Sequence, residues 1–436
     1  MNDRRTLVDR LKSGEIPEVL RRACEHEPLD AESIAERIVR GTVVFSLNSL
    51  RELERPCVIG EGLRTKVNAN LGTSADMSDL ESERAKLSAA VEAGADTVMD
   101  LSTGGDIDLV RRTIVSESPV PVGTVPIYQA AIESQARRGS IVQMTEDDMF
   151  GAIERHAADG VDFVTVHCGV TTRALECLEA TGRLADIVSR GGAFLSGWII
   201  YNEKENPLYS DFDRLLEIAR RYDLTLSLGD GFRPGAVSDA TDSAQIQELI
   251  TLGGLVMRCR EAGVQAMVEG PGHVPLGQVV ENVRLAKDIC RGAPFYVLGP
   301  LVTDVAPGYD HIVAGMGGAV AAASGADFLC YVTPREHLGL PGVEDVREGV
   351  VVTRIAAHAG DLAKNPDFFM QWDNRMSRAR KALKWDQQIE LSLDPRRAGS
   401  ILSECRVDEE KGCTMCGEFC AMKFIASYLK TDQESC

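Results

Sequence analysis

Three cysteines near the C-terminus, Cys413, Cys416 and Cys420, form a Cys-x2-Cys-x3-Cys run within KGCTMCGEFCAMKF. Closely spaced thiolates bind soft metal centres. Four thiolates would complete a structural zinc site, whereas three leave one iron of a 4Fe–4S cluster open to a small molecule. An open iron of this kind binds S-adenosylmethionine, and electron transfer then breaks its C5′–S bond to give a 5′-deoxyadenosyl radical. The run therefore predicts radical chemistry that uses a 4Fe–4S cluster and S-adenosylmethionine.

The spacing leaves a zinc knuckle open as an alternative, with Cys405 or Cys436 as a fourth ligand. Most of the other cysteines stand singly in apolar or mixed surroundings, where a small buried thiol is the plain interpretation. These are Cys24, Cys57, Cys168, Cys177, Cys259, Cys290 and Cys330. We therefore expect no disulfide framework.

Two histidines, His273 in VEGPGHVP and His337 in VTPREHLG, each follow a predicted strand. If both strands belong to one barrel, the two imidazoles could meet over its mouth and bind a divalent metal such as zinc. A competing hypothesis is a zinc-dependent barrel hydrolase that activates water here, with the cysteine tail as a structural zinc site. A third is a non-catalytic iron–sulfur sensor or carrier. We expect His26 and His156, which lie in charged helical stretches, at the surface.

A repeated strand–helix rhythm begins at about residue 64. Short apolar, β-branched runs end in polar residues or glycine, and amphipathic helical stretches follow them. The nine runs are 66–72, 96–102, 121–128, 162–169, 185–192, 224–231, 265–273, 295–301 and 326–333. Repeated units of this kind favour an α/β fold that closes as a (β/α)8 TIM-like barrel, with one of the nine runs outside the ring. The alternative is an open doubly wound sheet, disfavoured because no G-x-G-x-x-G turn follows the first strand.

The predicted organisation has four parts. Residues 1–62 form a small N-terminal appendage, 63–345 the catalytic barrel, 346–400 a helical region, and 401–436 a cysteine-rich, cluster-binding tail. Active sites of such barrels gather at the carboxyl ends of the strands. Polar residues recur there, among them Asn70, His167 and Asp230, which predicts a shared polar pocket.

Glycine-rich turns at 189–192, 229–235 and 269–272 could form anion-binding nests, with Arg190 and Arg233 supplying fixed positive charge. The formal net charge is −19, from 47 basic and 66 acidic residues, which predicts no nucleic-acid or membrane partner. The charged N-terminal stretch lacks the apolar run of a signal peptide, so we expect a cytoplasmic protein.

Long segments of the chain resemble one family. VNANLGTS, DTVMDLSTGGD, PVPVGTVPIYQA, VDFVTVHCGVT, LSLGDGFRPG, VEGPGHVP, CYVTPREHLGLP and CTMCGEFCAMK closely resemble the 4-amino-5-hydroxymethyl-2-methylpyrimidine phosphate synthases of thiamin biosynthesis. The resemblance covers nearly everything after about residue 60. It implies a barrel whose cysteine tail carries the cluster, a homodimer, 5-aminoimidazole ribotide as the substrate, and an electron donor of the flavodoxin or ferredoxin type.

The resemblance also implies residue roles. It places substrate contacts at Asn70, Met99, Tyr128, His167, Ser189, Arg190, Gly191, Asp230, Gly231, Phe232, Arg233, Glu269 and Tyr296. It implies that Glu269 and Tyr296 are also catalytic, that His273 and His337 hold the divalent metal, and that Cys413, Cys416 and Cys420 ligate the cluster.

Some segments depart from the family's usual pattern. The chain begins LVDRLKSGEIPEVLRRA in place of the common N-terminal signature, has VVFSLNSL before the barrel, and reads IIYNEKENPLY after Trp198. These departures are similar to the sister enzyme 5-hydroxybenzimidazole synthase, which starts from the same ribotide and makes the lower-ligand precursor of anaerobic cobamides. We therefore expect the benzimidazole product, with the thiamin pyrimidine as the alternative and Tyr201, Asn202 and Phe232 as product-steering residues.

Overall fold

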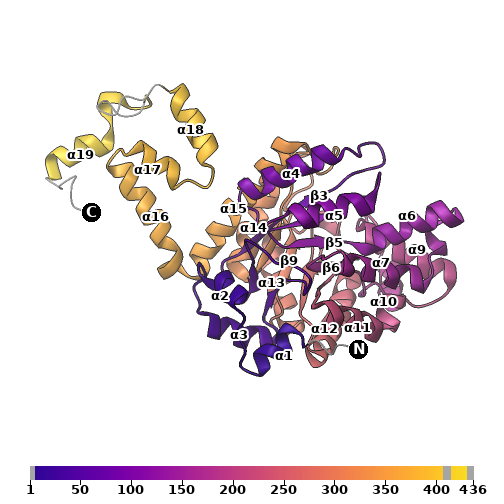
Figure 1. Cartoon of the computed structure of the whole chain (residues 1–436). Coiled ribbons are helices and arrows are strands. Elements are labelled where there is room, and N and C mark those ends of the chain that lie inside the picture. The colour runs from indigo at the N-terminus through magenta and orange to yellow at the C-terminus, as the bar shows by residue number, and fades with distance from the viewer. Residues whose placement is uncertain (1–4, 406–413, 430–436) are drawn as a thin grey trace. The chain divides into compact units, whose positions relative to one another are not determined.

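The computed structural model describes residues 5–405 and 414–429. The chain divides into two compact units, residues 1–364 and 365–436. The first unit holds the N-terminal helices, a small two-stranded sheet and a closed barrel (Figure 1). The domain boundaries at 62, 345 and 400 stay predictions.

Eight parallel strands close the barrel in the order β10-β3-β4-β5-β6-β7-β8-β9. Their bounds are β3 Lys66–Leu71, β4 Thr97–Asp100, β5 Val122–Thr124, β6 Phe163–Val166, β7 Thr225–Leu228, β8 Ala266–Gly270, β9 Phe295–Leu298 and β10 Phe328–Cys330. The strands are buried almost throughout because the ring of helices covers the outside and side chains fill the inside. The prediction of a (β/α)8 fold is confirmed.

Helices follow each barrel strand and cover the barrel. They are α4 Leu80–Glu92, α5 Ile107–Glu117, α6 Pro126–Arg138, α7 Glu146–Ala158, α8 Thr172–Thr181, α9 Arg190–Asn202, α10 Pro207–Ser210, α11 Phe212–Tyr222, α12 Ser243–Ala262, α13 Val279–Ile289, α14 Asp310–Ser324 and α15 Val343–Lys364. Short 3-10 turns lie at η1 Ile141–Gln143, η2 Val237–Asp239 and η3 Leu276–Gln278. Side-chain caps fix several helix starts, such as Asp79 before α4 and Thr145 before α7.

The ninth predicted strand, 185–192, is not a strand. It lies in the long insertion between β6 and β7 and ends in the first turn of α9. Ser189 is the N-cap of α9, and its hydroxyl accepts a hydrogen bond from the Gly192 N–H at 3.2 Å. The apolar residues of this run therefore precede a capped helix. A short apolar run before a helix has the same sequence pattern as a short strand, so the two cannot be separated by periodicity.

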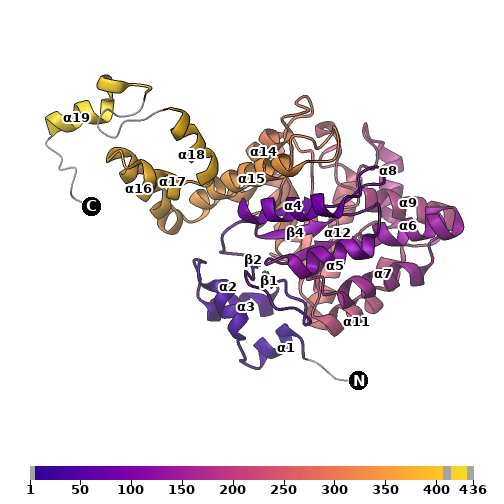
Figure 2. The ribbon, with the colours of Figure 1, turned by 45° about the horizontal axis from the view of Figure 1, so that its top comes forward.

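The N-terminal appendage lies at the amino ends of the barrel strands (Figure 2). It contains α1 Leu7–Lys12, α2 Glu18–Cys24, α3 Ala31–Arg40 and the antiparallel pair β1 Val43–Phe45 and β2 Val58–Gly60. Gln265, just before β8, pairs with the Phe45 backbone, and Asp162, just before β6, accepts from the Asn48 N–H. The appendage therefore closes the face of the barrel opposite to the one where catalytic residues gather.

One histidine prediction is wrong. His156 is buried, and its ring hydrogen-bonds Thr124 at 2.8 Å and Gln129 at 2.9 Å beside the buried Arg111. The charged residues next to it in sequence lie on the outer face of α7, whereas His156 faces the barrel. Burial lowers its pKa well below the usual value for histidine, so it is a neutral structural residue.

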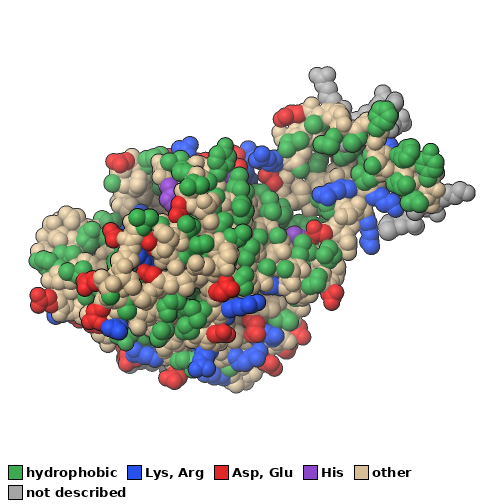
Figure 3. Space-filling model, turned by 180° about the vertical axis from the view of Figure 1, so that it is seen from behind, with side chains coloured by type: hydrophobic (Ala, Val, Ile, Leu, Met, Phe, Trp, Pro, Cys, Tyr) green, Lys and Arg blue, Asp and Glu red, His purple; other side chains and the backbone are tan. Residues whose placement is uncertain are grey.

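The second unit contains α16 Pro366–Lys381, α17 Trp385–Glu390, α18 Pro395–Glu404, η4 Gly417–Phe419 and α19 Ala421–Leu429. None of the helices in the part of the chain described is both long and apolar enough to cross a bilayer. The face seen in Figure 3 carries interspersed acidic and basic side chains. An anionic ligand of this acidic chain therefore depends on donors within its own site.

Candidate active site

A pocket opens at the carboxyl ends of the barrel strands. Eight of the predicted substrate contacts line it: Asn70, Met99, Tyr128, His167, Asp230, Arg233, Glu269 and Tyr296. The register explains the convergence, because Asn70 pairs with Met99 across β3 and β4, and Glu269 pairs with Tyr296 across β8 and β9. Tyr128 enters from the first turn of α6 and not from a strand.

Buried charge is concentrated on one side of the pocket. Asp230 forms an ion pair with Arg233 at 3.1 Å, three residues further along the same turn. Burial raises the pKa of Asp230 to about 7, although the Arg233 guanidinium opposes the rise. Burial also raises the pKa of Glu269, against hydrogen bonds from Ser227 and Thr165. The pocket therefore pairs a fixed cation with two carboxyl groups that retain protons more readily than usual.

Hydrogen bonds between strands fix the floor of the pocket. Glu269 accepts from the hydroxyls of Thr165 and Ser227, both at 2.6 Å. The Asn68 amide donates to the Tyr296 hydroxyl at 2.8 Å, and the Tyr296 ring stacks on Phe328 with centroids 4.1 Å apart. Both predicted catalytic side chains are thus held in single orientations before a ligand enters.

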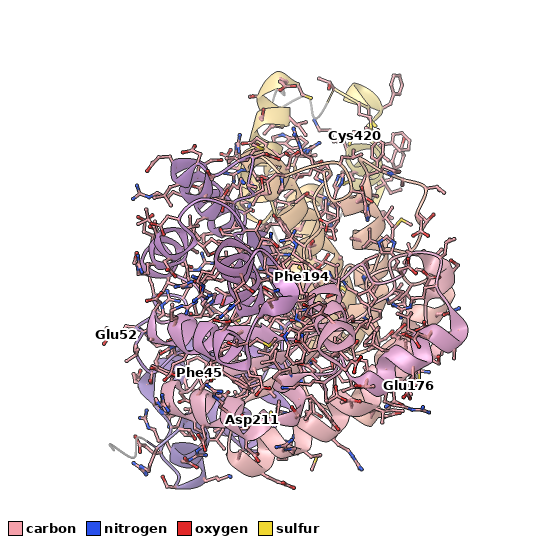
Figure 4. The ribbon with its side chains drawn as sticks, turned by 90° about the vertical axis from the view of Figure 1, so that its right-hand side faces the viewer. Phe45, Glu52, Glu176, Phe194, Asp211 and Cys420 are labelled. Carbon is pink, nitrogen blue, oxygen red and sulfur yellow. The ribbon has the colours of Figure 1, made fainter. Side chains whose placement is uncertain are left out.

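The N-terminus of α9 packs against two residues that line the pocket, His167 and Tyr128. A Cβ atom on Gly191 would lie 2.2 Å from Cε1 of His167, so the backbone passes directly over the imidazole. Burial lowers the pKa of His167 to about 3, and His167 is therefore neutral. Arg190 lies over the Tyr128 ring at 4.9 Å, and Phe194, near the centre of Figure 4, touches the same ring edge-on.

Ser189, Arg190 and Gly191 stand beside the lining residues, and the 189–192 turn meets the 229–235 turn. A Cβ on Gly192 would lie 2.2 Å from the Gly231 carbonyl oxygen. This close approach brings the first turn of α9 against the turn that carries Arg233. Two of the three glycine-rich turns therefore lie in direct contact beside the pocket.

Phe232 does not line the pocket. Its ring is fully buried in the core, and its N–H donates to Glu248 at 2.8 Å. Tyr201 and Asn202 lie at the far end of the 13-residue α9, where Tyr201 is 60% exposed and the Asn202 amide donates to the Val142 and Trp198 carbonyls. At a rise of 1.5 Å per residue this end is about 17 Å from the first residue of α9. The prediction that these three residues steer the product has no support in this geometry.

The predicted metal histidines lie together. The ring centroids of His273 and His337 are 5.3 Å apart. A tetrahedral zinc ion bound at about 2.0–2.1 Å by one nitrogen of each ring would hold the centroids roughly 5 Å apart, so the pair fits. Among residues 5–405 and 414–429, no cluster of three or more His, Cys, Asp or Glu side chains forms a metal site.

The predicted cluster ligands lie in the second unit. Cys413 is outside the described residues, Cys416 is exposed, and Cys420 is buried at the start of α19 (Figure 4). Cys416 and Cys420 are free thiols. Two of the three positions therefore carry the donor chemistry that an iron–sulfur cluster needs.

Sequence reasoning missed several residues that line the pocket. Cys330 was interpreted as a buried structural thiol, yet it lines the pocket and its sulfur accepts from the Asn70 amide at 3.1 Å. Thr165 lies there too. Period-two alternation could have found both, because Thr165 precedes His167 by two residues, and Cys330 follows the inward Phe328 by two.

The fold and pocket define a barrel enzyme with a cysteine-rich C-terminal unit. A profile of the Radical SAM ThiC family matches residues 6–427. The chain therefore belongs to this radical S-adenosylmethionine family.

Curated relatives match along nearly the whole chain. A phosphomethylpyrimidine synthase of Desulforudis audaxviator is 60% identical over 97% of this chain and 98% of its own. Enzymes of the same name from Desulforamulus reducens and Moorella thermoacetica are 59% and 58% identical, over 98% and 99% of this chain and 98% and 100% of their own.

The expectation of a 5-hydroxybenzimidazole product is wrong. It rested on departures in the N-terminal segment and after Trp198, but the relatives named phosphomethylpyrimidine synthase match across almost the entire chain. The structure gives the reason, since VVFSLNSL lies at the closed face of the barrel and Tyr201 at the outer end of α9. Changes at those places do not reach the pocket. Family membership likewise leaves the zinc hydrolase and the non-catalytic sensor without support.

Proposed function

We propose that this chain converts 5-aminoimidazole ribotide to 4-amino-5-hydroxymethyl-2-methylpyrimidine phosphate, the pyrimidine precursor of thiamin. The observation that carries the proposal is the pocket at the carboxyl ends of the strands, lined by eight residues for which the family resemblance implies substrate contacts. Its high identity to enzymes named phosphomethylpyrimidine synthase supports the same product.

The pocket and the turns beside it offer a partner for each part of the ribotide. The amino end of α9 and Arg233 suit the phosphate, because backbone N–H groups and a guanidinium both bind phosphate oxygens. Glu269 and Tyr296, held by hydrogen bonds from neighbouring strands, would contact the aminoimidazole or ribose and exchange protons with it. Neutral His167 and the Asn70 amide add uncharged hydrogen-bond partners.

The cofactors follow from the same proposal. Cys413, Cys416 and Cys420 would hold the 4Fe–4S cluster, which when bound supplies the electron that cleaves S-adenosylmethionine. His273 and His337 would hold a divalent metal, with zinc the leading candidate. We also propose a homodimer and a reductant of the flavodoxin or ferredoxin type.

The test is an anaerobic incubation of the cluster-loaded protein with aminoimidazole ribotide, S-adenosylmethionine and a reductant. The product is then identified by mass. We expect the pyrimidine phosphate and 5′-deoxyadenosine, and both should vanish when S-adenosylmethionine is omitted. A different aromatic product, or conversion in air without S-adenosylmethionine, would overturn the proposal.

A further inference from the structure

Each histidine of the proposed metal pair is backed by its own carboxylate. Nδ1 of His273 lies 2.7 Å from Asp304, and Nδ1 of His337 lies 2.8 Å from Asp310. An ionised carboxylate can only accept hydrogen bonds, so each Nδ1 must carry the hydrogen. The lone pair of each neutral imidazole is therefore on Nε2, the nitrogen left to bind a metal.

The second oxygen of each carboxylate is also occupied. Asp304 accepts the Val237 N–H at 2.9 Å, and Asp310 accepts the Gly308 N–H at 3.1 Å. Each aspartate thus receives one donor from an imidazole and one from a backbone amide. Both oxygens of each carboxylate therefore act as hydrogen-bond acceptors. An asparagine has only one acceptor oxygen, and its NH₂ group can only donate.

We propose that Asp304 and Asp310 are positioning residues that set the tautomer and direction of His273 and His337, and so determine the affinity of this site for a divalent cation. The inference rests on the proposed function only in taking the histidine pair as a metal site. Carboxylates behind metal-binding histidines typically contribute 10- to 100-fold to metal affinity.

The two aspartates differ in their surroundings. Asp310 is 4% exposed in the first turn of α14, whereas the Asp304 side chain is 34% exposed in the loop after β9. Water can replace part of the contact at Asp304 but not at Asp310. We expect Asp310→Asn to lower the affinity by about 100-fold and Asp304→Asn by about 10-fold.

Asparagine should be worse than alanine at both positions. To accept from Nδ1–H, the asparagine must turn its NH₂ group against the backbone N–H. If it flips, its NH₂ faces Nδ1 and favours the tautomer with hydrogen on Nε2, which leaves Nε2 without a lone pair for the metal. Alanine removes the hydrogen bond without favouring the wrong tautomer, so alanine variants should bind Zn²⁺ more tightly than asparagine variants. If the aspartates only filled space, the alanine variants would bind Zn²⁺ more weakly.

The test measures Zn²⁺ dissociation constants by chelator competition on the cluster-loaded full chain, in which the tail thiolates are already occupied. Nitrogen-15 spectra of selectively labelled histidine report the tautomers, and the chain has only seven histidines. Glu348→Gln is the matched control, since Glu348 faces another histidine, His311, at 3.5 Å. Thermal unfolding checks that each variant is folded.

Weaker Zn²⁺ binding in both asparagine variants, altered tautomers of His273 and His337, and wild-type binding in Glu348→Gln are expected. Wild-type affinity in both asparagine variants, or alanine variants weaker than asparagine variants, would overturn the inference. Zn²⁺ binding without conversion of the ribotide would count against the proposed function alone. An absence of Zn²⁺ binding to the wild-type protein would overturn this inference together with the metal assignment of His273 and His337, whereas conversion of the ribotide by the same protein would still support the proposed reaction.

Discussion

At the scale of single residues, the site depends on glycines that pack so closely against His167 that a side-chain Cβ would not fit. The His167 ring lies between two glycines, because a Cβ on Gly191 would be 2.2 Å from Cε1 and a Cβ on Gly229 would be 3.1 Å from Cδ2. His167 is also 2% exposed, so the ring has little space to move. Glycine at these positions fixes the imidazole at the pocket wall.

Gly191→Ala should therefore displace His167 and weaken ribotide binding. Overpacking typically costs about 1–3 kcal/mol, and a cost of that size in the bound state corresponds to roughly a 5- to 150-fold loss of affinity. Gly197→Ala is the matched control on the same helix, because its Cβ would meet Val142 at an ordinary 3.6 Å. Calorimetric titration with the ribotide checks this, and equal affinities for the two variants would contradict it.

Asp230 should make stability depend on pH. Burial raises its pKa to about 7 from 3.8, so the folded state favours the protonated form. This contribution is fully present below about pH 4 and is lost as pH rises through 7, by about 1.4 kcal/mol per pH unit and roughly 4 kcal/mol at most.

Asp230→Asn cannot ionise and should flatten that slope. Urea unfolding at pH 5, 6, 7 and 8 measures it, and the other buried carboxyl groups cancel because both proteins carry them. Parallel curves for the wild type and the variant would show that Asp230 titrates normally.

Residue types and strand ends predicted most of the pocket, but not all of it. Asn70, Glu269 and Tyr296 could be placed because inward residues at strand ends converge in any barrel. Phe232 could not, because its neighbours Asp230 and Arg233 face the pocket while its own ring turns into the core. A turn does not alternate regularly, so its residues cannot be assigned to a side from spacing.

At the scale of elements, β3 is anchored by a helix almost 300 residues away in sequence. Asp361 of α15 accepts from the Thr65 N–H at 3.0 Å and from the Thr65 hydroxyl at 2.6 Å, and also pairs with Lys364 at 3.0 Å. Asp361 is 1% exposed. This buried contact fixes the last helix of the barrel unit against the first strand.

Asp361→Ala should lower the free energy of unfolding by about 2–3 kcal/mol, because it leaves the buried Thr65 N–H without an acceptor and removes the ion-pair partner of the half-buried Lys364. Glu344→Ala on the same helix is the comparison. Glu344 is 71% exposed and 4.0 Å from Arg347, so its loss should cost about 1 kcal/mol or less. Guanidinium unfolding measures both, and similar losses would contradict the account.

The sequence pattern located all eight barrel strands, but it could not show which of the nine predicted runs was not a strand. The run at 185–192 has the apolar pattern of a strand, but in the structure it leads into α9, which Ser189 caps. Tyr128 shows the same limit, since Pro126 begins α6 within a run predicted as strand. Short runs do not carry enough periodicity to separate the two structures.

At the scale of the whole molecule, the barrel and the cysteine-bearing segment belong to separate compact units. Substitution in the second unit should therefore remove the cluster without removing ribotide binding. We expect Cys416→Ser and Cys420→Ser to lose the iron and the brown colour, with the dissociation constant of the ribotide within about twofold of wild type.

Cys405→Ser is the matched control, because a zinc knuckle could use Cys405 as a fourth ligand whereas a three-cysteine cluster does not need it. Retention of iron in Cys405→Ser supports the cluster. Loss of bound metal in that variant, or zinc in place of iron in the wild type, would contradict it. Iron and zinc analysis of anaerobically reconstituted protein provides the measurement.

The whole-molecule prediction from sequence was right about the fold and the family and wrong about the product. The error arose because departures from a family pattern were weighed without knowing which face of the barrel carries them. VVFSLNSL pairs with the amino ends of strands through Phe45 and Asn48, where it supports the fold. Position in three dimensions decides whether a difference bears on chemistry.

The central claim is that cleavage of S-adenosylmethionine is coupled to hydrogen removal from a ribotide bound in the barrel pocket. The most direct measurement uses aminoimidazole ribotide deuterated in the ribose, followed by mass analysis of the 5′-deoxyadenosine that is formed. The account predicts deuterium in 5′-deoxyadenosine together with the pyrimidine phosphate. Fully deuterated substrate turned over to product with 5′-deoxyadenosine that contains no deuterium would contradict it.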